Sequence, residues 1–170
     1  MTTYSAANDT TPATGLLATG FAVIRWLERV SYDTLFATPA RIFIALTFFL
    51  SGRTKVEGFL TLKPSTYYLF QYEYKIPVIP APIAAHIAAY SEHLFPLLLI
   101  LGLGSRLSAV ALLGMTTVIE VFVYPGAWET HLGWATALAF IVFRGPGALS
   151  LDHLIRRRFT GIRPESKRSD

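Results

Sequence analysis

The sequence has no cysteine among its 170 residues and few charged side chains. Without cysteine the chain can form no disulfide, thiolate metal site, iron–sulfur cluster or dithiol relay. Charged residues make up 15% of the chain and hydrophobic residues 52%, whereas a soluble domain usually carries roughly 25% charged residues. The mean hydropathy is +0.44, and long stretches are almost free of charge. This composition predicts an integral membrane protein.

The formal net charge is +4, which alone would suit an anionic partner. No basic groove or interleaved aromatic pattern accompanies the charge, so nucleic acid is not predicted as a partner. In so apolar a chain, the basic excess is better explained by arginines that stay on the cytoplasmic side of a membrane.

The N-terminal region divides into two predicted segments. Residues 1–15 are rich in small and polar residues and carry no positive charge, which predicts a disordered tail and not a signal peptide. Residues 16–31 have a helical period, with Arg25, Glu28 and Arg29 opposite an apolar face. Such an amphipathic helix either lies in the membrane interface or packs on the membrane domain, and the pattern fits both.

Four apolar segments predict four membrane-spanning helices. The first begins at Thr38-Pro39 and reaches bilayer length only if Arg53 and Lys55 lie inside the protein or snorkel outward. The others cover residues 83–103, 107–124 and 132–143. We therefore expect an all-α, integral membrane antiparallel four-helix bundle over residues 38–152, followed by a basic cytoplasmic tail over residues 153–170.

Aromatic residues mark the expected membrane boundaries. The connection over residues 59–80 is dense in tyrosine and proline, which is typical of an interfacial belt or a re-entrant cap. Trp128 and Trp134 are predicted to anchor the fourth span at the interface.

The positive charges predict the orientation. If both ends are cytoplasmic, the outer side receives few of the 15 Lys and Arg residues, namely Arg53, Lys55, Lys63 and Lys75. This bias predicts a multi-pass membrane protein with both termini on the cytoplasmic side.

Polar side chains within the spans are the candidate functional residues, because charge is costly in a bilayer. From the helix rise they converge on the outer half of the bundle, beneath the connection. As a ligand-binding set we expect Arg53, Lys55, His86, Tyr90, Glu92, His93, Glu120 and His131. No ligand spacing typical of metal sites connects them, so no metal is predicted.

Two interpretations of this set remain open. Glu92 pairs with Arg53 or Lys55 and simply holds two helices together, since an unpaired carboxylate there would be costly. Alternatively, the same groups build a ligand pocket, in which Glu92, Glu120 and His86 are the candidates for proton transfer.

Four sequence fragments, in order, resemble the DoxX family of bacterial and archaeal membrane proteins, which implies a location in the cytoplasmic (inner) membrane. They are Arg41 with Ser51-Gly52-x-x-Lys55, then Tyr74-Lys75-Ile76-Pro77 before the helix of Glu92, then the turn 102–106, and finally the closing segment 145–152. The resemblance implies a four-helix membrane fold and, loosely, redox or stress-response work. Because most members have no established activity, it implies no particular reaction.

Three functions follow as hypotheses. The first is an oxidoreductase subunit that interacts with a quinone and takes electrons from a membrane or periplasmic redox partner, since the chain itself holds no cofactor. The second is a non-enzymatic membrane anchor or assembly partner with structural ion pairs. The third is a small transporter, which lacks a visible inverted repeat and would need a homo-oligomer.

Overall fold

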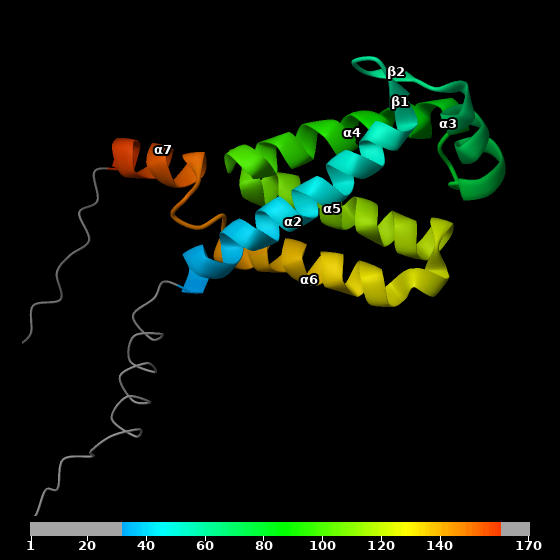
Figure 1. The fold of residues 1–170 in the computed structure, drawn as a ribbon. Coiled ribbons are helices and arrows are strands. Elements are labelled where there is room, and N and C mark those ends of the chain that lie inside the picture. Colours follow the sequence, from blue (N-terminus) through cyan, green and yellow to red (C-terminus); the bar gives the residue numbers. More distant parts are fainter. Residues whose placement is uncertain (1–31, 161–170) are drawn as a thin grey trace, which may run out of the picture. The chain divides into compact units, whose positions relative to one another are not determined.

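Four long helices dominate the computed structural model, which describes residues 32–160 (Figure 1). The predicted tail 1–15, the predicted interfacial helix 16–31 and residues 161–170 lie outside the described residues. The four helices are α2 (Tyr32–Lys55), α4 (Ala81–Leu101), α5 (Ser105–Val118) and α6 (Trp128–Arg144). A π-helical turn, η2 (Ile119–Val123), extends α5, and a 3-10 turn, η3 (Pro125–Ala127), leads into α6.

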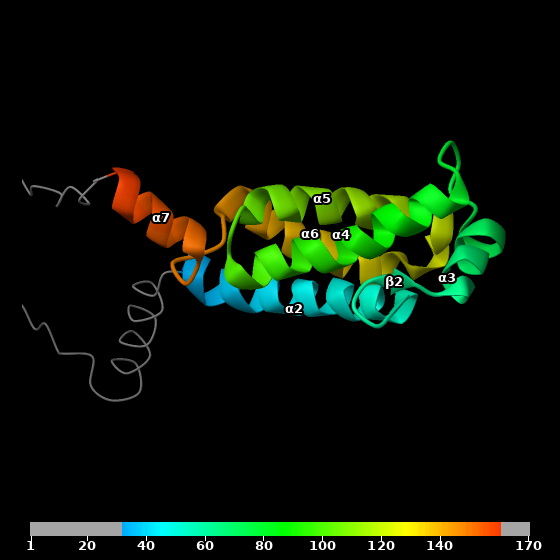
Figure 2. The same ribbon diagram turned by 90° about the horizontal axis from the view of Figure 1, so that it is seen from above.

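Each of these helices packs against two of the others. The contacts join α2 to α4, α4 to α5, α5 to α6, and α6 back to α2. Successive helices run in opposite directions (Figures 1 and 2). The end at which α4 turns into α5 is called the turn end below, and the opposite end is called the cap end.

Residues 56–80, called the cap segment below, cover the cap end. They form a two-stranded antiparallel hairpin, with β1 (Val56–Glu57) paired to β2 (Thr61–Leu62). The short helix α3 (Pro64–Tyr68) and the π-helical turn η1 (Leu69–Tyr74) follow. The hairpin is a small exception to the expected all-α fold, and it forms where Gly58 takes a left-handed conformation in the turn (φ 57°).

Three helical segments within the described residues are long and apolar enough to cross a membrane. They are Thr34–Lys55, Ala81–Leu101 and Ser105–Val123, and α6 with 17 residues is not among them. An all-α membrane protein is consistent with these helices. The expected helix start at Thr38-Pro39 is wrong: α2 begins at Tyr32 and contains Pro39. Membrane helices tolerate an internal proline when neighbouring groups satisfy the freed carbonyl.

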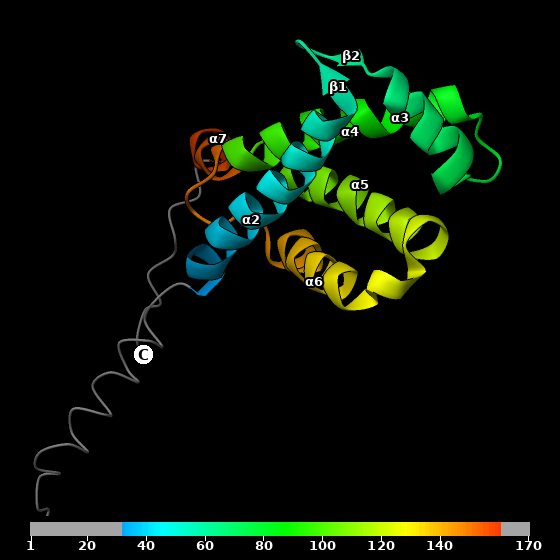
Figure 3. The same cartoon turned by 45° about the vertical axis from the view of Figure 1, so that its right-hand side comes forward.

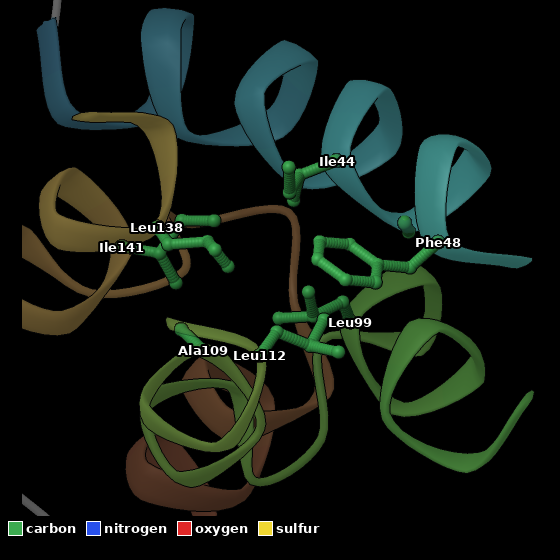
Figure 4. Close-up of a cluster of buried hydrophobic side chains, with 8 residues drawn as sticks. Ile44, Phe48, Leu99, Ala109, Leu112, Leu138 and Ile141 are labelled. Atoms are coloured by element: carbon green, nitrogen blue, oxygen red, sulfur yellow. The ribbon is translucent and has the colours of Figure 1, made fainter. Parts of the chain in front are cut away.

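The main core lies among all four helices (Figure 4). Ile44 and Phe48 of α2 meet Leu99 of α4, Leu112 of α5 and Leu138 of α6, and all five are almost fully buried. Trp134 packs edge-on against Phe48, with ring centroids 5.5 Å apart. The expectation that Trp134 anchors the interface is therefore wrong, because its ring packs against this core.

Helices α2 and α4 approach closely because small residues line their contact. Ala84, Ala85 and Ala89 of α4 are buried, as the run of alanines predicted. On α2, Gly52 is buried, and a Cβ atom there would lie 2.9 Å from the Cβ of Glu92 and from the ring of His93. Glu92 and His93 of α4 thus reach α2 because residue 52 has no side chain.

A carboxylate from the C-terminal segment holds the turn end together. Asp152 accepts hydrogen bonds from the backbone N–H groups of Gly104 (2.8 Å) and Ser105 (2.9 Å), so it caps α5 from 47 residues away. Its own N–H donates to the Gly102 carbonyl at 2.8 Å. The buried Arg41 donates to the Leu149 carbonyl at 2.7 Å. These bonds, called the clasp below, bring the two glycine-containing fragments of the sequence resemblance into direct contact.

The segment that contains Asp152 continues as a helix where the sequence predicted only a basic tail. Helix α7 (Leu151–Thr160) leaves the turn end of the four helices (Figure 2). It carries Leu154, Ile155 and Phe159, which are exposed, together with a run of three arginines. The dense positive charge of that run obscures the helical period of the apolar residues around it.

We expect Gly52→Ala to lower the thermal unfolding midpoint of the protein in detergent. The added methyl group would overlap Glu92 and His93, and overpacking typically costs about 1–3 kcal/mol. Gly114→Ala is the matched control, because a Cβ atom there would have no neighbour within 4 Å and alanine favours helices. Equal midpoints for the two variants would contradict the close approach of α2 and α4.

Candidate functional site

A buried ion pair joins α2 to α4 near the cap end. Lys55 Nζ lies 2.7 Å from one carboxylate oxygen of Glu92 and 3.0 Å from the other. The two side chains are 8% and 4% exposed, respectively. Of the two cations expected to pair with Glu92, the structure selects Lys55.

Polar neighbours complete the environment of this pair. Ser51, one helical turn before Lys55, accepts a hydrogen bond from the ammonium at 3.0 Å. The last carbonyl of α2, that of Lys55, accepts hydrogen bonds from the Thr66 hydroxyl (2.6 Å) and the Lys63 N–H (3.1 Å) of the cap segment. The cap segment therefore fixes the end of α2, from which the ammonium projects.

The ion pair lies in the wall of a cavity of about 430 Å³, called the central cavity below. Helices α4 and α5 diverge from their turn towards the cap end (Figure 3), and both contribute to its walls. Most lining side chains are aliphatic or aromatic, from all four helices and the cap segment. The polar lining residues are Thr47, Ser51, Lys55, Tyr74, Ser91, Glu92, Tyr124 and His131.

A second pair connects α5 to α6. His131 Nδ1 lies 2.5 Å from a carboxylate oxygen of Glu120, which belongs to the π-helical turn η2. His131 is buried and lines both the central cavity and a smaller hollow of about 280 Å³, whereas Glu120 lines only the hollow. The His131 ring thus stands between the cavity and a more exposed carboxylate.

The other candidate residues do not line the central cavity. Arg53 is exposed and donates to the carbonyls of Gly58 and Phe59 in the hairpin turn. His86 contacts Tyr67 (3.3 Å) and the ring of Tyr90, which is 47% exposed.

His93 is buried against Phe49, and its Nδ1 lies 2.6 Å from the Ala89 carbonyl. Its Nε2 atom is buried and has no hydrogen-bond partner among the described residues. Among residues 32–160, no group of three or more His, Asp or Glu side chains is placed to hold a metal ion.

Sequence reasoning missed the aromatic part of the site. Tyr74 of the cap segment and Tyr124, after η2, meet edge-on with ring centroids 5.8 Å apart, and both line the central cavity. Trp134 and Phe70 line it as well. The only signal in the sequence was the density of tyrosines in the connection, which does not say which ring points inward.

Tyr74 is held in its neutral form. Burial raises the pKa of the Tyr74 phenol well above its usual value, and a hydrogen bond with Tyr124 adds to the effect. The carboxylates of Glu92 and Glu73 raise this pKa further, because they repel a phenolate. Tyr74 therefore remains a hydrogen-bond donor at the cap end of the cavity.

We expect Lys55→Met and Glu92→Met each to destabilise the protein by about 3–5 kcal/mol, because each leaves one buried charge unpaired. The double variant should lose less than either single variant, since it removes both charges. The unfolding midpoints of the native protein, the two single variants and the double variant, in one detergent, measure the coupling between Lys55 and Glu92. Additive losses would contradict a direct interaction between the two side chains.

Stability should fall at high pH partly through Tyr74. An unfolded tyrosine ionises at a pKa of about 10, whereas the folded protein keeps Tyr74 protonated. The fold favours the neutral phenol, so its contribution to stability is complete below the unfolded pKa. The contribution declines as the pH rises above that value towards the folded pKa. Between about pH 9 and pH 11, we expect the thermal unfolding midpoint of Tyr74→Phe to fall less than that of the native protein. An equal loss in both proteins would contradict a neutral, buried Tyr74.

Comparisons with known proteins identify the family of this chain. The sequence model of the DoxX family matches residues 36–125, which contain the ion pair and most of the central cavity. A Haemophilus influenzae protein, described as an uncharacterized protein, is 32% identical over 128 residues, covering 69% of this chain and 81% of the relative. No solved structure shows significant similarity to the chain. The chain therefore belongs to the DoxX family of membrane proteins.

Proposed function

We propose that this DoxX-family membrane protein binds a small lipid-soluble ring compound in the central cavity, a quinone being the best chemical match. The observation that carries the proposal is the position of the Lys55–Glu92 pair in the wall of an otherwise apolar cavity. The volume of about 430 Å³ lies within the range of about 300–1,000 Å³ that is typical of small-molecule sites.

The residues present fit a quinone headgroup. The Lys55 ammonium, the Tyr74 hydroxyl and the His131 ring offer hydrogen-bond donors to carbonyl oxygens. Phe70 and Trp134 offer faces and edges for stacking on a flat ring. Glu92 and the His131–Glu120 pair supply groups that can exchange the protons that accompany quinone reduction. Bound quinone would supply the electron chemistry, and this chain would orient it and move protons.

Entry from the lipid phase suits such a ligand. Ile87 of α4 lines the cavity and is 52% exposed, and the cavity-lining face of α4 continues through Ser91 and Phe95. A ligand with a lipid tail would therefore pass between α4 and α5 without crossing water. The cap segment, through Ile76 and Ile79, closes the cavity at its end.

Four membrane crossings, with both termini in the cytoplasm, complete the proposal. Helix α6 is short for a span, but it packs between α2 and α5, which are both long enough to cross. It therefore shares their depth, and a short span is accommodated by local thinning of the bilayer. The turn end carries Arg41, Arg106 and Arg144, and this charge bias supports a cytoplasmic location for that end. A bacterial or archaeal cell is what the family resemblance implies.

Electrons must come from a partner protein under this proposal. The chain has no cysteine to relay them. The role that fits is a quinone-binding subunit of a redox or stress-response membrane complex, in line with what the family resemblance implies.

Quenching of Trp134 fluorescence by a short-chain quinone tests the proposal. The variant Trp26→Phe/Trp128→Phe in lipid nanodiscs retains Trp134 alone, because the chain has three tryptophans. We expect saturable quenching, and Glu92→Gln should weaken binding about tenfold, the size of one charged hydrogen bond. Tyr90→Phe is the matched control on the same helix, outside the cavity.

A second variant separates binding from folding. Ala88→Phe should fill part of the cavity while both residues of the ion pair are kept, and should abolish saturable quenching while the protein stays folded. Quenching that is linear in quinone concentration and unchanged in Ala88→Phe would sink the proposal.

The second candidate is a membrane anchor or assembly partner. It is favoured by one observation, that Lys55 and Glu92 satisfy each other and Ser51 without any ligand. A folded Lys55→Met/Glu92→Met protein that still assembles with its partners, together with absent quinone binding, would support this role.

A further inference from the structure

We propose that the turn end carries a binding site for one anionic phospholipid, in a hollow between the start of α5 and helix α7. The hollow has a volume of about 260 Å³, and Arg106 of α5 and Arg156 of α7 both line it. The inference needs only that the helices lie in a bilayer. It is independent of any ligand in the central cavity, which lies at the other end of the helices.

The charge of the hollow suits a phosphodiester. Arg106 is exposed, and its guanidinium group lies beside the backbone of Gly145. Two arginines can bind phosphate oxygens through paired N–H donors, a geometry that a planar guanidinium favours. The remaining charged group in the hollow, Asp152, already accepts two backbone N–H bonds from the α5 terminus. The side chains that line the hollow thus include two cations and one anion.

Apolar side chains in the same hollow favour a lipid over free phosphate. Leu107 is 72% exposed on α5, and Ile155 is 46% exposed on α7. Both lie next in sequence to the arginines, so an apolar surface adjoins the charged one. A phospholipid matches this pattern, with its phosphate between the arginines and the start of its acyl chains against the leucine and isoleucine.

Helix α7 adds a broader attraction to an anionic membrane surface. It begins at the turn end with the clasp residue Asp152 in its first turn (Figure 2) and continues with Arg157 and Arg158. Its apolar residues Leu154 and Phe159 are 57% and 82% exposed. A short helix with these two kinds of residue, next to membrane spans, is typical of one that lies in the headgroup region.

Lipid retention by the full chain tests this site. Native mass spectrometry counts phosphatidylglycerol and phosphatidylcholine molecules bound to the protein released from mixed nanodiscs. We expect one tightly retained phosphatidylglycerol in the native protein. Arg106→Gln and Arg156→Gln should each lower its affinity about tenfold, the loss of one charged hydrogen bond. Leu107→Asn should lower it without any change of charge.

Arg157→Gln is the matched control, because it removes the same charge from the same helix outside the hollow. Its expected effect is less than about twofold, as for a surface charge that only adds to diffuse attraction. An equal loss in Arg157→Gln and Arg156→Gln would overturn the site and leave only diffuse attraction to the anionic surface. Displacement of the lipid by inorganic phosphate at equal concentration would also overturn it, in favour of a phosphate site.

A measurement on the native protein distinguishes loss of lipid binding from a folding defect in the arginine variants. Phosphatidylglycerol added to the detergent-solubilised chain should raise its unfolding midpoint, and phosphatidylcholine should not. No difference between the two lipids would overturn the proposal. Quinone quenching of Trp134 should be unchanged in Arg106→Gln, so failure of one proposal leaves the other standing.

Discussion

The ion pair between Lys55 and Glu92 is the interaction around which the cap end is organised. A single charge at that depth would be costly, so each residue requires the other within contact distance. That requirement brings α2 and α4 together, and Gly52 provides the space. It also fixes where the cap segment lies, because Thr66 and Lys63 bind the carbonyl of the residue that carries the ammonium.

The two ends of the helices use polar groups in different ways. At the turn end, Asp152 accepts hydrogen bonds from the backbone of the α4–α5 turn, and Arg41 donates one to the segment after α6. At the cap end, the ion pair holds α2 to α4 and at the same time stands in the wall of a cavity. Charged groups thus fix the backbone at the turn end, whereas at the central cavity they also face a space that can hold a ligand.

This division explains why family membership says little about the reaction. The closing segment 145–152, the most specific fragment of the resemblance, meets the turn 102–106 in the clasp at the turn end. They are needed for the fold whatever the cavity binds. Tyr74, Tyr124 and Trp134 shape the cavity itself, and such rings accommodate changes of ligand because they mainly supply apolar surface.

The sequence by itself determined that the chain is a helical membrane protein, where its long helices run, and that Glu92 needs a cationic partner. These features depend on local hydropathy, helical period and the cost of buried charge, all of which are properties of short segments. Only the tertiary structure decided that Lys55 pairs with Glu92 while Arg53, two residues away, turns to the hairpin. Likewise, His86 and His93 are seven residues apart and so lie on one side of α4, but their neighbours come from different elements, Tyr67 of α3 and Phe49 of α2. A period gives the direction of a side chain on its own helix, whereas its partner depends on where another helix packs.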